Sequence, residues 1–214
     1  MQRIICSRNL SLALAATLLM SAAAVRAQSE NSPSSDSGPG WQLAGATARL
    51  DHTLDTKTAK QGERVEAKLA DTVKAANGTM LPRGTQLLGT ITAVAPYQND
   101  NPSRISLRFD QARMQNGKTL PVKVTVIGAY PGNENQLAIY DQQTMGSAPR
   151  HVPAQDQFTQ QPGTLSHVTM TSRVSGHNSA TFSDNKGDVK LEAGTFLQVG
   201  IAPRQNNASS SAGM

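Results

Sequence analysis

The residues that most often carry enzyme chemistry are present in this sequence, but none of them form a recognisable catalytic or metal-binding pattern. The histidines are His52, His151, His167 and His177. No two of them have the H-x-x-x-H or H-x-H spacing that brings two imidazoles to one metal ion. The serines Ser172, Ser175 and Ser179 lie outside any G-x-S-x-G nucleophile motif. The sequence therefore predicts no catalytic, cofactor-binding or metal-binding residue, and we expect a protein that is not an enzyme.

One acidic segment has some features of a calcium loop. Asp184 and Asp188 flank Asn185, Lys186 and Gly187, and oxygen-bearing side chains at alternate positions are what calcium prefers. The later acid that would complete such a loop as a bidentate ligand is missing at the required spacing. We expect a tight turn rather than a calcium site.

The N-terminus has the three parts of a secretory signal peptide. Met1–Asn9 contains two arginines and no acid, and Leu10–Val25 is apolar and rich in alanine. Ala27 then offers a small residue at the cleavage position. The apolar stretch is shorter than the roughly 20 residues needed to cross a bilayer, so an uncleaved anchor is the less favoured alternative. We predict a signal peptide over 1–27 and a protein exported to the periplasm, the cell envelope or beyond, without a transmembrane span after its removal.

Removal of the signal peptide changes both the charge and the sulfur chemistry. Cys6, the only cysteine of the chain, lies within it, as do three of the 20 Lys and Arg residues, which leaves 17 basic against 15 acidic residues. The exported form therefore has no disulfide and no thiol nucleophile. Its small net charge, without a basic cluster, excludes electrostatic binding of nucleic acid.

Composition divides the rest of the chain into one domain with tails. A leader over 28–44 and a tail over 204–214 are rich in Ser, Pro, Gly and Asn, a composition that cannot bury enough apolar surface to order itself. We place a single β domain over 45–203. Within it, 129–163 is rich in Gln, Pro and Gly and is predicted to be a polar insertion loop.

Apolar and polar residues alternate in the segments between the turns, as in half-buried β-strands. Val65, Ala67 and Leu69 share one face of the first such segment. The pattern is cleanest over 120–126 and recurs over 87–94, 105–110, 168–172 and 197–201. Strands this short, at roughly ten-residue spacing, predict an all-β fold, either a small β-barrel or a sandwich of antiparallel strands.

Glycines and prolines mark the turns between these strands. Asn-Gly pairs at 77–78 and 116–117 predict tight hairpins with a positive φ at both positions. The segments Leu81–Leu87 and Leu191–Leu197 share the pattern L-x-x-G-T-x-L, which is either a pair of equivalent barrel corners or chance. The structural turn residues that we predict are Asn77, Gly78, Pro82, Gly84, Asn116, Gly117 and Gly194.

Several of these segments resemble a known family. Val65-Glu66-Ala67, the LPRGTQLLG run at 81–89, Phe109 and the NGKTLP run at 116–121 resemble the C-terminal β-barrel domain of the TrbI-like scaffold proteins of type IV secretion and conjugation channels. The run at 54–68 is similar to that of exported bacterial proteins that carry this domain alone. The likeness covers about 50–128 and 187–201 and implies a barrel that works as a scaffold in the cell envelope.

The chain departs from the secretion scaffolds in the 129–163 insertion. Their barrel carries an apolar helical insertion that crosses the outer membrane, whereas this one is polar and proline-rich and cannot span a bilayer as a helix. We therefore expect a non-enzymatic interaction or scaffold protein with a protein partner in the envelope. The alternative is a secreted hydrolase or a carbohydrate-binding module. Tyr130, Tyr140 and Phe158 either contact the partner or pack over the barrel mouth, and the sequence favours neither.

Overall fold

The computed structural model describes residues 42–132, 152 and 154–204, which form an all-β domain without a helix. All of these residues belong to the second of the two compact units of the chain, Gly38–Met214. The predicted all-β class is therefore confirmed. The signal peptide, Tyr140, and most of the leader, the insertion and the tail lie outside the described residues.

Most strands are short and follow one another closely along the chain. They are β1 (Ala44–Leu50), β2 (Leu54–Asp55), β3 (Arg64–Leu69), β4 (Val73–Lys74), β5 (Met80–Leu81), β6 (Gln86–Ala95), β7 (Ser103–Arg113), β8 (Thr119–Tyr130), β9 (Gln157–Gln160), β10 (Val168–Arg173), β11 (Ala180–Asp184), β12 (Lys190–Leu191) and β13 (Phe196–Pro203).

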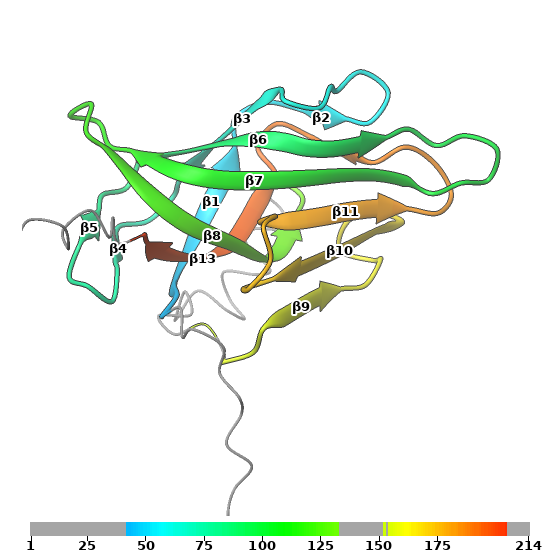
Figure 1. The fold of residues 1–214 in the computed structure, drawn as a ribbon. Helices are drawn as coiled ribbons and strands as arrows, with labels where there is room; N and C mark the ends of the chain where they lie inside the picture. Colours follow the sequence, from blue (N-terminus) through cyan, green and yellow to red (C-terminus); the bar gives the residue numbers. More distant parts are fainter. Residues whose placement is uncertain (1–41, 133–151, 153, 205–214) are drawn as a thin grey trace, which may run out of the picture. The chain divides into compact units, whose positions relative to one another are not determined.

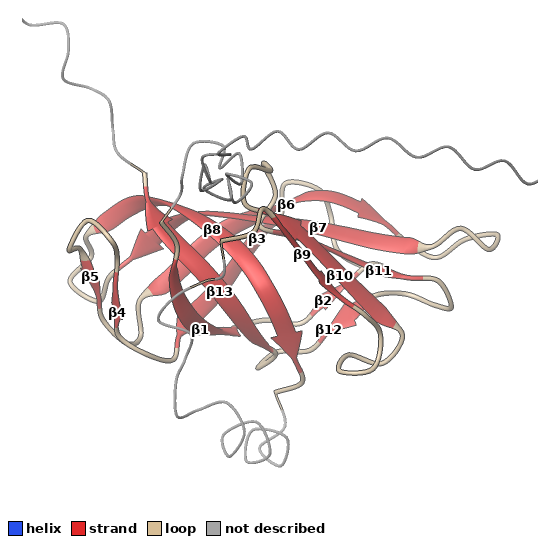
Figure 2. Cartoon of the chain, turned by 90° about the horizontal axis from the view of Figure 1, so that it is seen from below, coloured by secondary structure: helices blue, strands red, loops and turns tan. Residues whose placement is uncertain are grey.

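Six antiparallel strands close into a barrel in the order β6-β3-β1-β13-β8-β7 (Figure 1). Pairing of β6 with β7 closes the ring. The sheet then continues from β7 through β11 and β10 to β9, an extension of three strands that runs beside the barrel (Figure 2). Two further pairs, β2–β12 and β4–β5, form small ribbons. The fold is therefore a barrel rather than a sandwich.

Apolar residues at alternate positions fill the interior, as the alternation predicts. In β3, Val65, Ala67 and Leu69 are at most 2 % exposed, while Arg64 and Lys68 lie on the surface. Burial of such side chains contributes roughly 1.5–3 kcal/mol each for the larger ones. The largest fully buried side chains are Leu50, Leu69, Leu81, Leu87, Ile91, Ile105, Leu107, Phe109, Met170, Phe182, Leu191 and Leu197.

The two L-x-x-G-T-x-L segments form equivalent corners of the barrel. Gly84 and Gly194 adopt φ of 85° and 89°, a region that residues with a Cβ avoid. In each corner the following threonine, Thr85 or Thr195, donates its hydroxyl at 2.7 Å to the carbonyl three residues earlier. The glycine N–H groups donate to Leu69 O at 2.8 Å and to Leu50 O at 2.7 Å, respectively. The repeated L-x-x-G-T-x-L pattern therefore specifies the same turn at two places in the chain.

The equivalence extends from the corners to the strands that they join. Leu197 pairs with Ala48 after one corner, and Leu87 pairs with Ala67 after the other. The register then shifts at the matching position in both halves, after Gln198 where β13 meets β8 and after Leu88 where β6 meets β7, so the extra residue of each bulge lies on the partner strand. The barrel thus consists of two similar halves, β1-β13-β8 and β3-β6-β7, that meet between β1 and β3 and again between β7 and β8.

The Asn-Gly hairpins differ in detail from the predicted turns. Gly78 and Gly117 have φ of 82° and 81°, but neither preceding asparagine has a positive φ. Each glycine N–H closes a four-residue turn, on Ala75 O and Met114 O. The side chains of Asn77 and Asn116 instead accept a backbone N–H two residues on, which stabilises an ordinary turn conformation of the asparagine.

The strands β7 and β8 separate soon after their hairpin. They pair only from Arg113 with Thr119 to Gln111 with Pro121. Beyond this fork β11 takes over the edge of β7. Ser179, just before β11, fills the fork, since its N–H donates to Leu107 O at 2.7 Å and its carbonyl accepts from Val126 N at 2.8 Å.

The equivalent corner glycines predict equal costs of substitution. Gly84→Ala and Gly194→Ala each force a Cβ into the left-handed region and should reduce the free energy of unfolding by about 1–2 kcal/mol. Chemical denaturation would measure this loss. Gly187→Ala is the matched control, because an added Cβ there meets no atom within 4 Å and φ is not in that region. A harmless Gly194→Ala would contradict the equivalence of the corners.

Ser179 offers a second test, of the fork. Its hydroxyl accepts the buried N–H of Phe109 at 2.9 Å, so Ser179→Ala leaves that donor unpaired and should cost about 1–3 kcal/mol of stability. Ser183→Ala, on the neighbouring strand, removes a hydroxyl with no hydrogen bond to the described residues and should cost under about 0.5 kcal/mol. Equal losses in the two variants would argue against the role of Ser179.

Candidate interaction site

Among the strands that the structure describes, β9 is the free edge of the extension. It pairs with β10 on one side, with Thr159 opposite Thr171 and Phe158 opposite Ser172. The N–H of Val174 donates to Asp156 O at 2.7 Å and continues this ladder. Hydrogen-bonded and non-bonded pairs alternate along an antiparallel ladder. The N–H and C=O groups of Gln157 and Thr159 therefore point away from β10, toward the open edge.

The other backbone and side-chain groups of β9 hold it against the barrel. The carboxamide of Gln160 accepts the N–H of Ala129 and donates to the carbonyl of the same residue, both at 2.7 Å. It thus pairs with the edge of β8 as a peptide group would. The ring of Phe158 is 4 % exposed and packs inward. On β10, the hydroxyl of Ser172 donates to Val126 O. The edge strand is consequently positioned at three points.

The residues of β9 themselves lack the charges and prolines that usually protect such strands. Exposed edges in natural proteins carry lysines, prolines or inward-pointing charges that prevent pairing with another chain. The four residues Gln157–Gln160 include neither a charge nor a proline. Their outward side chains, Gln157 and Thr159, are polar and exposed. Within the strand itself, its shortness is the one protective feature.

Two charged groups pin the turn that follows β10. Asp156 accepts the N–H of Ser175 at 2.8 Å and its hydroxyl at 3.0 Å, and these bonds hold the pKa of the Asp156 carboxyl below its ordinary value. The ammonium of Lys123, on β8, donates to the carbonyl of Gly176. Burial lowers the pKa of Lys123, and the nearby Arg204 lowers it further. The turn is therefore fastened to both β9 and β8.

The aromatic residues predicted to contact a partner lie in different surroundings. Tyr130, at the end of β8, is half-buried, and its hydroxyl donates to Gln198 Oε1 at 3.2 Å. Phe158 is buried within the extension, and Tyr140 lies outside the described residues. Phe196 pairs with Tyr130 across the strands, with the Arg49 guanidinium 5.6 Å from its ring centre. The two described residues of the three, Tyr130 and Phe158, thus lie in different surroundings.

The histidines and acids do not assemble into a metal site within the described ranges. No three His, Cys, Asp or Glu side chains gather there closely enough to hold an ion. His52, His167 and His177 are exposed, and His151 lies outside the described part.

The predicted turn residues lie where the chain reverses. Gly78, Gly84, Gly117 and Gly194 all have a positive φ. Asn77 and Asn116 cap their turns. The carbonyl of Pro82 accepts hydrogen bonds from the N–H and from the hydroxyl of Thr85. These residues shape the barrel and contribute no chemistry of their own.

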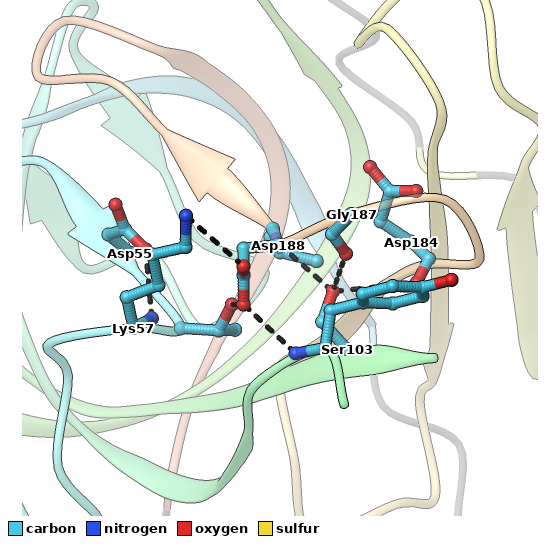
Figure 3. Close-up of polar contacts among 9 residues, drawn as sticks. Asp55, Lys57, Ser103, Asp184, Gly187 and Asp188 are labelled. Atoms are coloured by element: carbon cyan, nitrogen blue, oxygen red, sulfur yellow. Dashed lines mark hydrogen bonds and ion pairs between the residues drawn. The ribbon is translucent and has the colours of Figure 1, made fainter. Parts of the chain in front are cut away.

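The acidic segment at 184–188 is a clasp between three parts of the fold (Figure 3). Asp184 accepts the N–H of Lys186 at 2.7 Å, which makes the segment a turn, as the sequence predicts. The hydroxyl of Ser103 donates to Gly187 O at 2.6 Å and accepts from Val189 N at 3.0 Å. The start of β7 is thereby attached to the segment.

Asp188 completes this clasp with its carboxylate. It accepts the N–H of Tyr97 and the hydroxyl of Thr56, both at 2.9 Å, and lies 3.5 Å from the Lys57 ammonium. The bond from Tyr97 contributes most to lowering the pKa of Asp188, with Thr56 and Lys57 adding to it. A carboxylate committed in this way to neighbouring groups stabilises the loop rather than serving as an acid or base.

Comparisons with known proteins identify no relative. No protein-family model matches the chain, and no curated protein matches its sequence. Among the described residues, no helix is long and apolar enough to cross a bilayer.

The clasp makes stability depend on pH in a definite direction. A carboxyl with a lowered pKa in the folded state stabilises the fold above its unfolded pKa, and this contribution is lost as the pH falls through the folded value. Asp188→Asn should therefore lower the melting temperature by a few degrees at neutral pH, and by progressively less as the pH falls below about 4, the ordinary pKa of an aspartate. Circular dichroism measures both. Asp71→Asn, at an exposed carboxyl, should show neither effect, and a constant deficit in Asp188→Asn would contradict the assignment.

Proposed function

We propose that this protein is an exported, non-enzymatic interaction or scaffold protein of the bacterial cell envelope. The outer edge of β9 is the place where a protein partner adds a strand. Main-chain hydrogen bonds then give the affinity, and the outward side chains Gln157 and Thr159 contribute specificity. The observation that carries the proposal is this uncharged, proline-free edge beside a barrel whose own strands are all paired.

The closed barrel is what makes the edge of β9 distinctive. Closure pairs the strands β6, β3, β1, β13, β8 and β7 in a ring and leaves no free edge there. Of the described strands in the main sheet, β9 is the one that has a single neighbour. Gln160, Ser172 and Asp156 hold it in place, so a partner strand would meet a preformed template and would order little of this protein on binding.

The sequence supports the cellular setting of the proposal. The pattern over 1–27 favours export, and the resemblance to TrbI-like barrels favours an envelope scaffold. The polar 129–163 segment departs from the membrane-crossing insertion of those scaffolds, so we propose a role beside envelope proteins rather than as a channel wall. Under this proposal the corner glycines and threonines are structural, since the family likeness rests mainly on such turn residues.

A proline at the outward position tests strand addition directly. Thr159→Pro removes an N–H that points to the open edge and leaves the bonds of Phe158 and Gln160 to β10 in place, a setting in which strands tolerate proline. We expect a partner captured from envelope extract by the wild-type protein to bind this variant at least about tenfold more weakly, since two chains then share fewer hydrogen bonds.

Thr159→Val is the matched control, because it changes the same side chain and keeps the N–H. It should bind the partner within a few-fold of wild type, and both variants should melt near the wild-type temperature. Unchanged binding by Thr159→Pro would exclude the β9 edge. Failure to capture any partner, together with hydrolytic activity of the purified protein, would overturn the scaffold function itself.

A further inference from the structure

A pocket of about 380 Å³ opens on the face of the extension that points away from the core. Phe158, Met170 and Phe182 cover the buried face of β9, β10 and β11. Side chains at the alternate positions, and from the turn between β10 and β11, line the pocket. The ones that matter for recognition are Gln157, Thr171, Arg173, His177, Asn178 and Thr181.

The hydrogen bonds within the lining determine which groups remain for a ligand. A guanidinium has only donors, so Gln157 presents its Oε1 to Arg173 Nη2, at 3.0 Å, and keeps its amide NH₂ as a donor. The hydroxyl of Thr92 shares its proton between Asn178 Oδ1 at 2.8 Å and Ser106 O at 3.2 Å, which leaves the NH₂ of the Asn178 amide. The two amide oxygens are thus used inside the protein, and the pocket is rich in donors.

The acceptors that face this pocket are few. The hydroxyl of Thr181 is shared with that of Ser106 at 2.9 Å. No carboxylate is among the lining residues, and that of Asp156 is bonded to Ser175 outside it. A ligand that fits must therefore offer acceptors, and the free N–H groups of Arg173 favour an anion with two oxygens in one plane.

Size and polarity restrict the ligand further. The volume lies within the range of small-molecule sites and far exceeds the roughly 30 Å³ that one water occupies in the liquid. The lining contains no Phe, Tyr or Trp side chain and one small apolar side chain, that of Ala180, so a large apolar ligand would find no hydrophobic anchor. Hydroxyl and amide groups from Thr171, Thr181 and Asn178 suit a molecule with several hydroxyls.

We propose that this pocket binds the carboxylate of a sugar-sized polyhydroxy acid, of which a uronic acid is the simplest example. Arg173 pairs with the carboxylate, and the NH₂ groups of Gln157 and Asn178 donate to it or to the adjacent ring oxygens. The hydroxyl of Thr171 contacts the ligand hydroxyls. The site uses side chains on the face of the sheet, whereas strand addition takes its affinity from the backbone at the edge, and Gln157 is the residue that the two sites share.

Titration of the purified exported protein, followed by the backbone amide signals of Gly176, His177 and Asn178 in NMR spectra, tests this site. The probes are sodium glucuronate, glucose and sodium sulfate. We expect saturable shifts with glucuronate, and much weaker ones with glucose, which lacks the carboxylate, and with sulfate, which lacks the hydroxyls. Arg173→Gln should weaken glucuronate binding at least about tenfold, because a charge-assisted pair is lost.

Arg104→Gln is the matched control. It makes the same change at an exposed arginine of β7 outside the pocket lining and should bind glucuronate as the wild type does. Arg173 is exposed, so its variant should fold, and an unchanged melting temperature would verify this. Equal binding of glucose or of sulfate, an equal loss in Arg104→Gln, or shifts with glucuronate that do not saturate would each overturn the proposal.

Discussion

The backbone of β8 needs hydrogen-bond partners on both sides, although β7 leaves it soon after their hairpin. Buried peptide groups without partners are strongly unfavourable. The extension supplies the hydrogen-bond partners that β7 does not. The N–H of Val126 donates to Ser179 O, and the carbonyl of Val126 accepts from the Ser172 hydroxyl. The carboxamide of Gln160 pairs with the N–H and C=O of Ala129. Because β9, β10 and β11 are required to complete the barrel wall, they are held rigidly beside it. Both the open edge and the pocket are consequences of that requirement.

Two charged side chains hold the turn between β10 and β11 in place. Lys123 lies on β8 with its ammonium against Gly176 O, and Asp156 before β9 holds Ser175. The turn between β10 and β11 is therefore attached to the barrel on one side and to the edge strand on the other. A long polar turn would otherwise be among the first parts of a sheet to move. Its attachment keeps His177 and Asn178 in place beside Arg173 and gives the pocket a defined lining.

Local patterns in the sequence predict the strands and turns well, but not their partners. The alternation of Val65, Ala67 and Leu69 predicts β3, and the L-x-x-G-T-x-L pattern predicts the two glycine corners. Strand β9 escapes prediction because QFTQ is four residues long within a polar run. The outward direction of the Thr159 backbone depends on its register with β10, and the free NH₂ of Asn178 depends on Thr92. Such properties arise from pairing between distant segments, which no single stretch of sequence reveals.

The two halves of the barrel are interleaved along the chain, and this affects how the molecule is made. Strand β1 lies near the start of the domain but pairs with β13 at its end, Ala46 opposite Val199. While the polypeptide is synthesised, or threaded through a translocation channel, β1 must wait for nearly the whole domain before its neighbour arrives. Contacts this far apart in sequence make folding slow. A growing chain of this protein should therefore stay open until its last strand emerges, a state that is compatible with the export that we propose.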